Sequence, residues 1–153
     1  MISFLPILEQ VYPRILTQVC RDAGSPAYGS FDRNWWHYKI RDFSSVILQQ
    51  GGYFIHVLKD LKSFEAYKNN LENIARASVD FWVKRCLKKG AFEEYYPWED
   101  GYPPLAFSSL SVAKIVEAQN LVYPELEKAL QKASKKLMQR FETALALSDV
   151  ANA

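Results

Sequence analysis

Residues 65–88 read EAYKNNLENIARASVDFWVKRCLK, and apolar side chains recur in this stretch at steps of three and four positions. The residues that share this spacing are Tyr67, Leu71, Ile74, Ala75, Ser78, Phe81, Trp82 and Cys86. Because an α-helix has 3.6 residues per turn, side chains at this spacing line one face of a helix. The pattern therefore predicts an amphipathic helix over 65–88 that packs on a core.

The same periodicity recurs elsewhere in the chain, over residues 3–22, 38–62, 106–120 and 124–147. Pro13 is expected to kink or interrupt the first of these helices, whereas Pro124 suits the first turn of the last. Gly51 and Gly52 either weaken the helix over 38–62 or allow a neighbour to approach it closely. We therefore expect a single all-α domain over 1–153.

Composition narrows the class of protein. The 153 residues are 49% hydrophobic and 24% charged, which is the balance of a soluble globular domain. With 19 basic and 17 acidic residues, the chain lacks the excess of basic residues expected of a protein that binds nucleic acid. No apolar run approaches the ~18 residues of a membrane span, and no signal peptide is recognised, so we expect a cytoplasmic protein without a membrane partner.

The cysteines, and the absence of metal-binding and phosphate-binding motifs, limit the kinds of site that the sequence predicts. Cys20 and Cys86 stand alone, each within an apolar helical pattern, and we expect buried thiols rather than a disulfide. Their spacing does not suit a metal, and the sequence has no glycine-rich phosphate loop. We therefore expect no metal and no cofactor.

Two aromatic stretches, at 23–37 and 90–105, separate predicted helices and resemble each other. The first contains GSFDRNWW and the second GAFEEYYP, so that Gly29, Phe31 and Asp32 correspond to Gly90, Phe92 and Glu93. Phe-Ser-Ser follows each stretch, at 43–45 and 107–109, and we expect these serines near helix N-termini. A repeat of this length is typical of stacked helical pairs, so we expect antiparallel helical hairpins with both stretches on one rim.

The run SPAYGSFDRNWWHYKIRDFSSVILQQGGY (25–53), with GAFEEYYPWEDGYPPLAFSS (90–109), resembles the N-terminal helical region of heparinase II/III-like polysaccharide-processing proteins. The resemblance covers about residues 1–120. It implies a partial (α/α) toroid with a groove for an acidic polysaccharide, and the lyase members of the family act by β-elimination from a uronic acid. A full toroid needs more hairpins than this chain holds. We therefore expect a fragment or a reduced relative that is incomplete for catalysis alone.

The aromatic stretches carry the predicted substrate-binding residues. Aromatic faces stack on the C–H faces of sugars, while acidic, amide and guanidinium groups bind hydroxyls and carboxylates. The candidates are Arg33, Asn34, Trp35, Trp36, Arg41, Glu93, Glu94, Tyr95, Tyr96, Trp98 and Glu99. The alternative is that these stretches form a hydrophobic lid on the helices. A further alternative is that the cations form ion pairs: Arg41 with Asp42, and Arg33 with Asp32 or with Glu93 across the rim.

His37 and Tyr38 are the candidate catalytic residues. In a lyase, a general base removes the C5 proton of the uronate and a tyrosine protonates the leaving oxygen. The alternatives are a structural histidine at a helix start, or a hydrolase acid–base pair among the acidic residues of 93–100. His56 lies within an apolar helical pattern and is expected in the core or at an interface.

The sequence also supports a second class of function, a structural or assembly role. An incomplete ring of helices leaves the apolar face of its last helix without a partner. We therefore also consider a structural or assembly domain that forms a homo-oligomer through 3–22 or 124–147, or that joins a missing C-terminal part of a longer protein. A terpenoid-processing toroid is disfavoured, because no DDxxD motif occurs.

Overall fold

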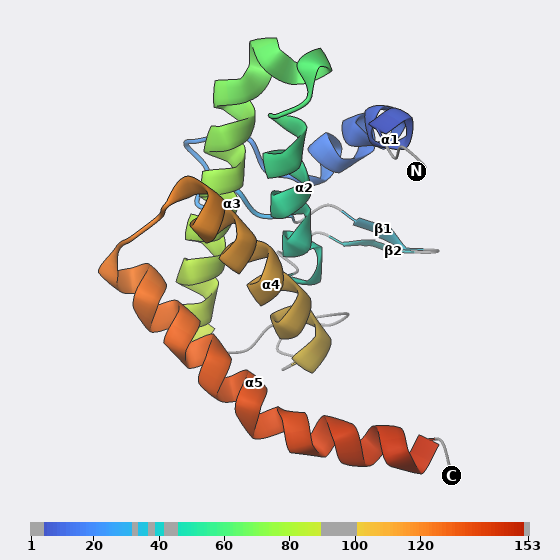
Figure 1. Cartoon of the computed structure of the whole chain (residues 1–153), viewed down its shortest axis with the longest axis vertical. Coiled ribbons are helices and arrows are strands. Elements are labelled where there is room, and N and C mark those ends of the chain that lie inside the picture. The colour runs from blue at the N-terminus through green and yellow to red at the C-terminus, as the bar shows by residue number, and fades with distance from the viewer. Residues whose placement is uncertain (1–4, 32–33, 37–38, 42–45, 90–100, 152–153) are drawn as a thin grey trace.

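The computed structural model of the chain (Figure 1) describes residues 5–31, 34–36, 39–41, 46–89 and 101–151. Within these ranges only the backbone is described for residues 5, 34–36, 39–41, 46–47, 89 and 142–151. The elements in chain order are α1 (Leu5–Gln18), β1 (Asn34–Trp36), β2 (Lys39–Arg41), η1 (Val46–Gln50), α2 (Gly51–Leu58), η2 (Lys62–Tyr67), α3 (Lys68–Lys89), α4 (Tyr102–Gln119) and α5 (Pro124–Ala151). Helices dominate, so the predicted all-α class is confirmed.

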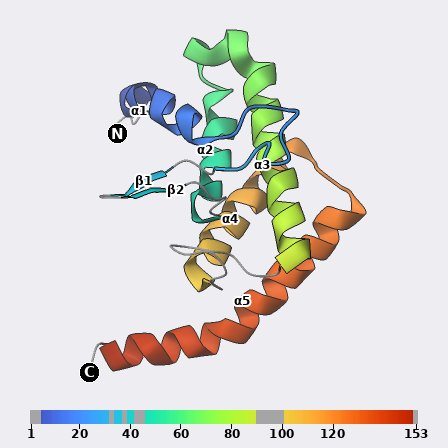
Figure 2. The ribbon, with the colours of Figure 1, turned by 180° about the vertical axis from the view of Figure 1, so that it is seen from behind.

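Helix α3 is the central element of the fold. It packs against α2, α4 and α5, and the views from opposite sides show these helices around it (Figures 1 and 2). Trp82 of α3 is completely buried, and its indole N–H donates a hydrogen bond of 2.9 Å to the Ser108 hydroxyl of α4. The predicted helix over 65–88 thus forms the middle of the core.

The apolar side chains that pack around α3 form one core cluster. Its fully or almost fully buried members include Ile55, Leu58, Leu71, Ala75, Val79, Trp82, Leu105, Val112, Ile115, Leu126 and Ala129. They come from α2, α3, α4 and α5. The hydrophobic effect on this cluster holds the helices together.

Part of the predicted helix over 38–62 is a strand. Residues 39–41 form β2, which pairs antiparallel with β1, whereas Val46–Gln50 form the 3-10 turn η1 and Gly51–Leu58 form α2. The prediction was therefore wrong over 39–41, where the pairing with β1 determines the backbone conformation and local apolar spacing does not. The close approach predicted at Gly51 and Gly52 is confirmed: a Cβ atom on Gly52 would overlap the Ser78 hydroxyl of α3.

Helix α4 begins earlier than predicted. It starts at Tyr102 with Pro103 and Pro104 in its first turn, where a missing backbone N–H costs nothing. Ser108 therefore lies in the helix interior, where its hydroxyl donates to the Pro104 carbonyl at 2.6 Å. The prediction that Ser108 and Ser109 lie at a helix N-terminus was wrong, because the two prolines already supply the start signal.

Some members of the predicted apolar faces are exposed. Tyr67, Leu110 and Phe141 have exposed fractions of 60%, 58% and 51%. Helix α1 also runs through Pro13 without interruption. Helix α5 continues past the other helices, so that its C-terminal half projects from the body of the fold (Figure 1).

Both cysteines are free thiols, as predicted. Cys86 is buried between α3 and α5, and its Sγ lies 3.3 Å from the Ala129 carbonyl. Burial raises the pKa of this thiol, although the nearby Lys132 and Lys136 act in the opposite direction. Cys20 is only half-buried, because it lies just beyond the end of α1. Within the described residues, no helix is long and apolar enough to cross a membrane.

Candidate functional site

Most of the residues predicted to bind or transform substrate lie outside the described part of the chain. These are Arg33, His37, Tyr38, Glu93, Glu94, Tyr95, Tyr96, Trp98 and Glu99. Asn34, Trp35, Trp36 and Arg41 lie in the two-stranded sheet, whose backbone is described. The register of that sheet places Asn34 opposite Arg41, which brings two predicted binding residues side by side.

A different site is fully described: a groove between α1, the 19–31 segment, η2 and the first turns of α3. Its volume is about 480 Å³, within the range of pockets that hold small ligands. The residues that line it are Tyr12, Leu16, Arg21, Tyr28, Phe64, Tyr67, Asn70, Leu71, Asn73 and Ile74. We call it the aromatic groove.

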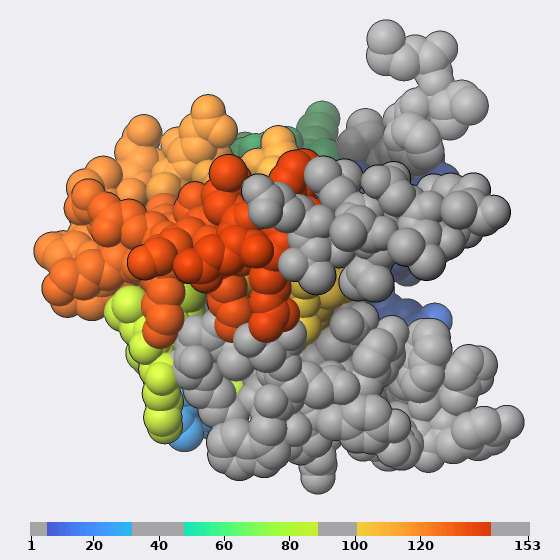
Figure 3. Space-filling model, turned by 90° about the horizontal axis from the view of Figure 1, so that it is seen from below, coloured from blue at the N-terminus to red at the C-terminus, as the bar shows by residue number. Residues whose placement is uncertain are grey.

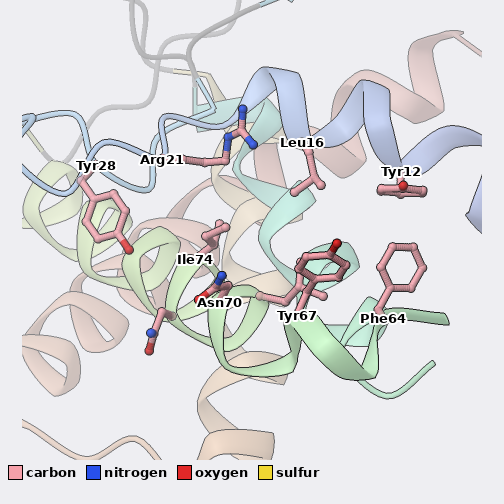
Figure 4. A pocket seen from close by; sticks show the side chains of 10 residues that line it. Tyr12, Leu16, Arg21, Tyr28, Phe64, Tyr67, Asn70 and Ile74 are labelled. Atoms are coloured by element: carbon pink, nitrogen blue, oxygen red, sulfur yellow. The ribbon is translucent and has the colours of Figure 1, made fainter. Parts of the chain in front are cut away.

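The aromatic side chains gather mainly at one end of the groove. Figure 4 shows Tyr12, Phe64 and Tyr67 close to one another there, and Tyr28 at the opposite end. The rings of Tyr12 and Phe64 meet edge to face, with centroids 4.6 Å apart and an interplanar angle of 81°. This T-shaped contact is a favoured geometry for aromatic pairs, and it fixes the Tyr12 ring against the buried Phe64. Tyr67 remains exposed and can receive a ligand on its face.

Polar groups lie between the two aromatic ends. Arg21 comes from the segment after α1, and Asn70 and Asn73 come from the first turns of α3. Arg21 and Asn70 lie between Tyr28 and the ring cluster in Figure 4. The guanidinium suits a carboxylate or sulfate, and the amides both donate and accept hydrogen bonds. Among the described residues that line the groove, none is a carboxylate or a histidine. These groups can bind a ligand that carries both an anionic group and hydroxyl groups.

The segment that carries Arg21 and Tyr28 is tied to α3 by one buried side chain. Gln49 Nε2 donates to the Gly29 carbonyl at 2.7 Å and to the Ser78 carbonyl at 2.9 Å, while Gln49 Oε1 accepts from the Phe31 N–H at 3.2 Å. Gln49 is only 1% exposed. Its amide therefore replaces the backbone partners that this irregular segment lacks.

Sequence reasoning missed this site because its residues are scattered over four elements. Tyr12, Tyr28 and Tyr67 have no common local motif, and the apolar spacing of 65–88 predicts Tyr67 on the buried face of a helix. The one sequence feature that points to this site is the stretch SPAYGS (25–30), in which the aromatic Tyr28 stands among residues typical of turns. Nothing in the sequence indicates that this ring meets α3.

The buried histidine lies apart from the groove and predicts an acid sensitivity. His56 is 5% exposed, as expected of a core residue, and its Nδ1 accepts a hydrogen bond of 3.3 Å from Gln119 Nε2. Burial, with the Lys59 charge, lowers the pKa of His56 from its usual 6.5, although Asp60 and Glu72 oppose this. The unfolded chain therefore binds a proton more readily, and stability falls as the pH drops below about 6.5.

Urea unfolding at pH 7.5 and 5.5 tests this expectation. The wild-type chain should lose more free energy of unfolding between these values than the His56→Gln variant, which cannot take up the proton. Equal losses in the two proteins would show that His56 does not control the acid response.

No family model matches this chain, and no curated protein or solved structure does so either. In the described part of the chain, no three His, Cys, Asp or Glu side chains are grouped so that they could hold a metal ion. The features of this chain that bear on function are the geometry of the aromatic groove and the aromatic stretches of the sequence.

Proposed function

We propose that this chain recognises carbohydrate, and that the aromatic groove is its binding site. The observation that carries the proposal is the set of three tyrosines, two asparagines and one arginine that share one groove of about 480 Å³. Sugar rings present C–H faces that stack on tyrosine, and their hydroxyls pair with amide groups. The exposed Tyr67 ring offers the stacking platform, and Asn70 and Asn73 lie next to it along the chain.

Arg21 directs the proposal toward acidic sugars. A guanidinium forms charge-assisted, bidentate hydrogen bonds with a carboxylate or sulfate. No carboxylate is among the described residues that line the groove, so none of them competes for Arg21 or repels an anionic ligand. The preferred ligand is therefore a uronic-acid saccharide, the class that the resemblance to heparinase II/III-like proteins also implies.

The predicted binding residues of the aromatic stretches belong to the same proposal. The backbone register of the β1–β2 sheet pairs Asn34 with Arg41, and we keep both residues as candidates for binding further sugar units. Catalysis by His37 and Tyr38, and a partial (α/α) toroid of helical hairpins, remain predictions. We propose that the chain alone binds sugar and turns over little, which absorbance of unsaturated uronate products would test.

Tyr67→Ala is expected to weaken the binding of trigalacturonate about two- to tenfold, because one stacking contact is worth about 0.5–1.5 kcal/mol. Isothermal titration calorimetry measures this change. Phe107→Ala is the matched control, since Phe107 is similarly exposed at 55% but lies on α4, outside the groove. Arg21→Gln should weaken the binding of trigalacturonate while leaving that of neutral maltotriose unchanged. Equal affinities of wild type and Tyr67→Ala would contradict the proposed site.

A second candidate function is assembly, which the projecting half of α5 favours. Met138 and Phe141 are 71% and 51% exposed in this region, and these are large apolar side chains for a free helix surface. Figure 3 shows side chains of α5 lying beside those of the C-terminal part of α3, in keeping with the contact between these two helices.

We propose a second copy of this chain as the partner of α5, arranged antiparallel. The projecting part carries Glu142 and Asp149 against a single Arg140, whereas Lys128, Lys132, Lys135 and Lys136 outnumber the acidic residues of the first part. An antiparallel pair therefore brings the acidic end of one helix toward the basic stretch of the other.

Light scattering after size-exclusion chromatography tests this assembly. The wild-type chain should have the mass of a dimer, and Phe141→Asp should have that of a monomer. Val122→Asp is the control, because Val122 is 93% exposed but precedes α5, and this variant should remain dimeric. A monomeric mass for the wild type at micromolar concentration would exclude assembly through α5.

A further inference from the structure

Helix α1 forms one wall of the aromatic groove but contributes little to the core. Between residues 6 and 18, no side chain of α1 is buried; Tyr12, Ile15 and Leu16 pack on the core cluster and are each half-buried. Helix α3, on the opposite side of the groove, has completely buried side chains such as Ala75 and Trp82. Elements with few buried apolar contacts open at a lower free energy than the core of the same protein.

The contacts of α1 are arranged as a latch and a hinge. At the latch, Glu9 accepts a hydrogen bond from the Ser63 hydroxyl of η2, and the Tyr12 ring packs on Phe64 of η2. At the other end, the chain is anchored directly after the helix. Val19 is buried and forms a β-bridge with Phe31, and the Cys20 N–H donates to the Ser30 carbonyl at 2.8 Å.

We infer that α1 is a hinged wall of the groove, which opens at the Gln18–Val19 junction while the remaining helices stay folded. Opening breaks the Glu9–Ser63 bond, separates Tyr12 from Phe64, and removes the packing of Ile15 and Leu16 on the core cluster together with the contacts between α1 and α2. Tyr12 and Phe64 both line the groove. A ligand that contacts Tyr12 on α1 and Tyr67 on η2 holds the wall closed. This last step rests on the proposed function, whereas the hinge itself does not.

The geometry limits what can act as the latch. Glu9 and Ser63 lie outside the set of lining residues, so their substitution alters the closure of α1 without removing a ligand contact. Glu9→Gln keeps an acceptor oxygen and preserves the latch. Ser63→Ala removes the donor. Thr17→Ala is the matched control, because the Thr17 hydroxyl donates only within α1, to the Arg14 carbonyl at 2.7 Å.

Hydrogen exchange of the full chain, read by mass spectrometry, tests the hinge without a ligand. Amides of α1 should exchange faster than those of α3 in the wild type, and about tenfold faster again in Ser63→Ala, while α3 is unchanged. Glu9→Gln and Thr17→Ala should match the wild type at α1. If α1 and α3 exchange together, or if Ser63→Ala leaves α1 unchanged, the hinged wall is overturned.

A second arm with trigalacturonate separates this inference from the proposed function. Binding that slows α1 exchange about tenfold supports both. Binding that leaves α1 exchange unchanged overturns the closure of the wall and retains carbohydrate recognition. Absence of any binding heat overturns carbohydrate recognition, while the exchange rates of the free chain still decide the hinge.

Discussion

Replacement of Gln49 by methionine is expected to lower the free energy of unfolding by about 3–5 kcal/mol. Methionine preserves the length of the side chain but removes both donors and the acceptor of the amide. The Phe31 N–H and the Gly29 carbonyl then lose their Gln49 partner, and each buried polar group left without a partner costs about 1–3 kcal/mol. The Ser78 carbonyl loses the bond from Gln49 but keeps its place in the hydrogen-bond ladder of α3. Because domains are stable by only about 5–15 kcal/mol, the variant should be close to unfolding.

Urea unfolding followed by circular dichroism measures this loss. Gln50→Met is the matched control, because Gln50 is adjacent but exposed, and its unfolding free energy should stay within about 0.5 kcal/mol of the wild type. Gln49→Glu should be as damaging as Gln49→Met, since an ionised carboxylate cannot donate to the two carbonyls. A Gln49→Met chain as stable as the control would show that the 29–31 segment is held by other contacts.

Replacement of Gly29 by alanine should destabilise the chain by about 4 kcal/mol or more. Gly29 has φ = 82°, a conformation that alanine adopts only at a cost of about 1–2 kcal/mol. In addition, a Cβ atom at this position would overlap the backbone carbonyl of Ala77 in α3. The backbone of α3 is fixed by its own hydrogen bonds and cannot move aside. Residues 29–31 must therefore move away from α3, which breaks their hydrogen bonds with Gln49.

The thermal unfolding of Gly29→Ala should lose its cooperativity or shift to a much lower temperature. Gly24→Ala is the control within the same segment, because a Cβ atom on Gly24 meets nothing closer than Asp22 Oδ1 at 3.4 Å. Its stability should be unchanged or slightly raised, since alanine restricts the unfolded chain. A small change in unfolding temperature for Gly29→Ala would mean that Gly29 does not lie in close contact with the backbone of α3.

The helices could be predicted from the sequence where one face packs over many turns. α3 and α5 follow the spacing of Leu71, Trp82, Leu126 and Ala133, and all four of these side chains are buried. Pro124 correctly indicated where α5 begins. Local periodicity was sufficient here, because the buried stripe of each helix is continuous in the chain.

The remainder depends on contacts that local patterns do not contain. Gln49 is polar and stands in a helical pattern, yet it is buried. Its hydrogen-bond partners lie 18–29 residues away in the chain, so no local pattern identifies them. Tyr67 matches the apolar spacing of α3 but lies in the preceding 3-10 turn, so it faces the groove. The predicted catalytic pair His37 and Tyr38 lies outside the described residues and remains a prediction.

Titration of ¹³C-labelled tyrosine rings with trigalacturonate, followed by NMR, tests carbohydrate recognition in the groove most directly. The chain has nine tyrosines, and Tyr12, Tyr28 and Tyr67 line the groove. Tyr53 stacks near His56, and Tyr123 donates to Asp80 at 2.6 Å; both lie away from it and serve as internal controls. We expect the three groove rings to shift in a saturable manner while Tyr53 and Tyr123 do not. Shifts confined to rings outside the groove, or no shift at all, would contradict the account.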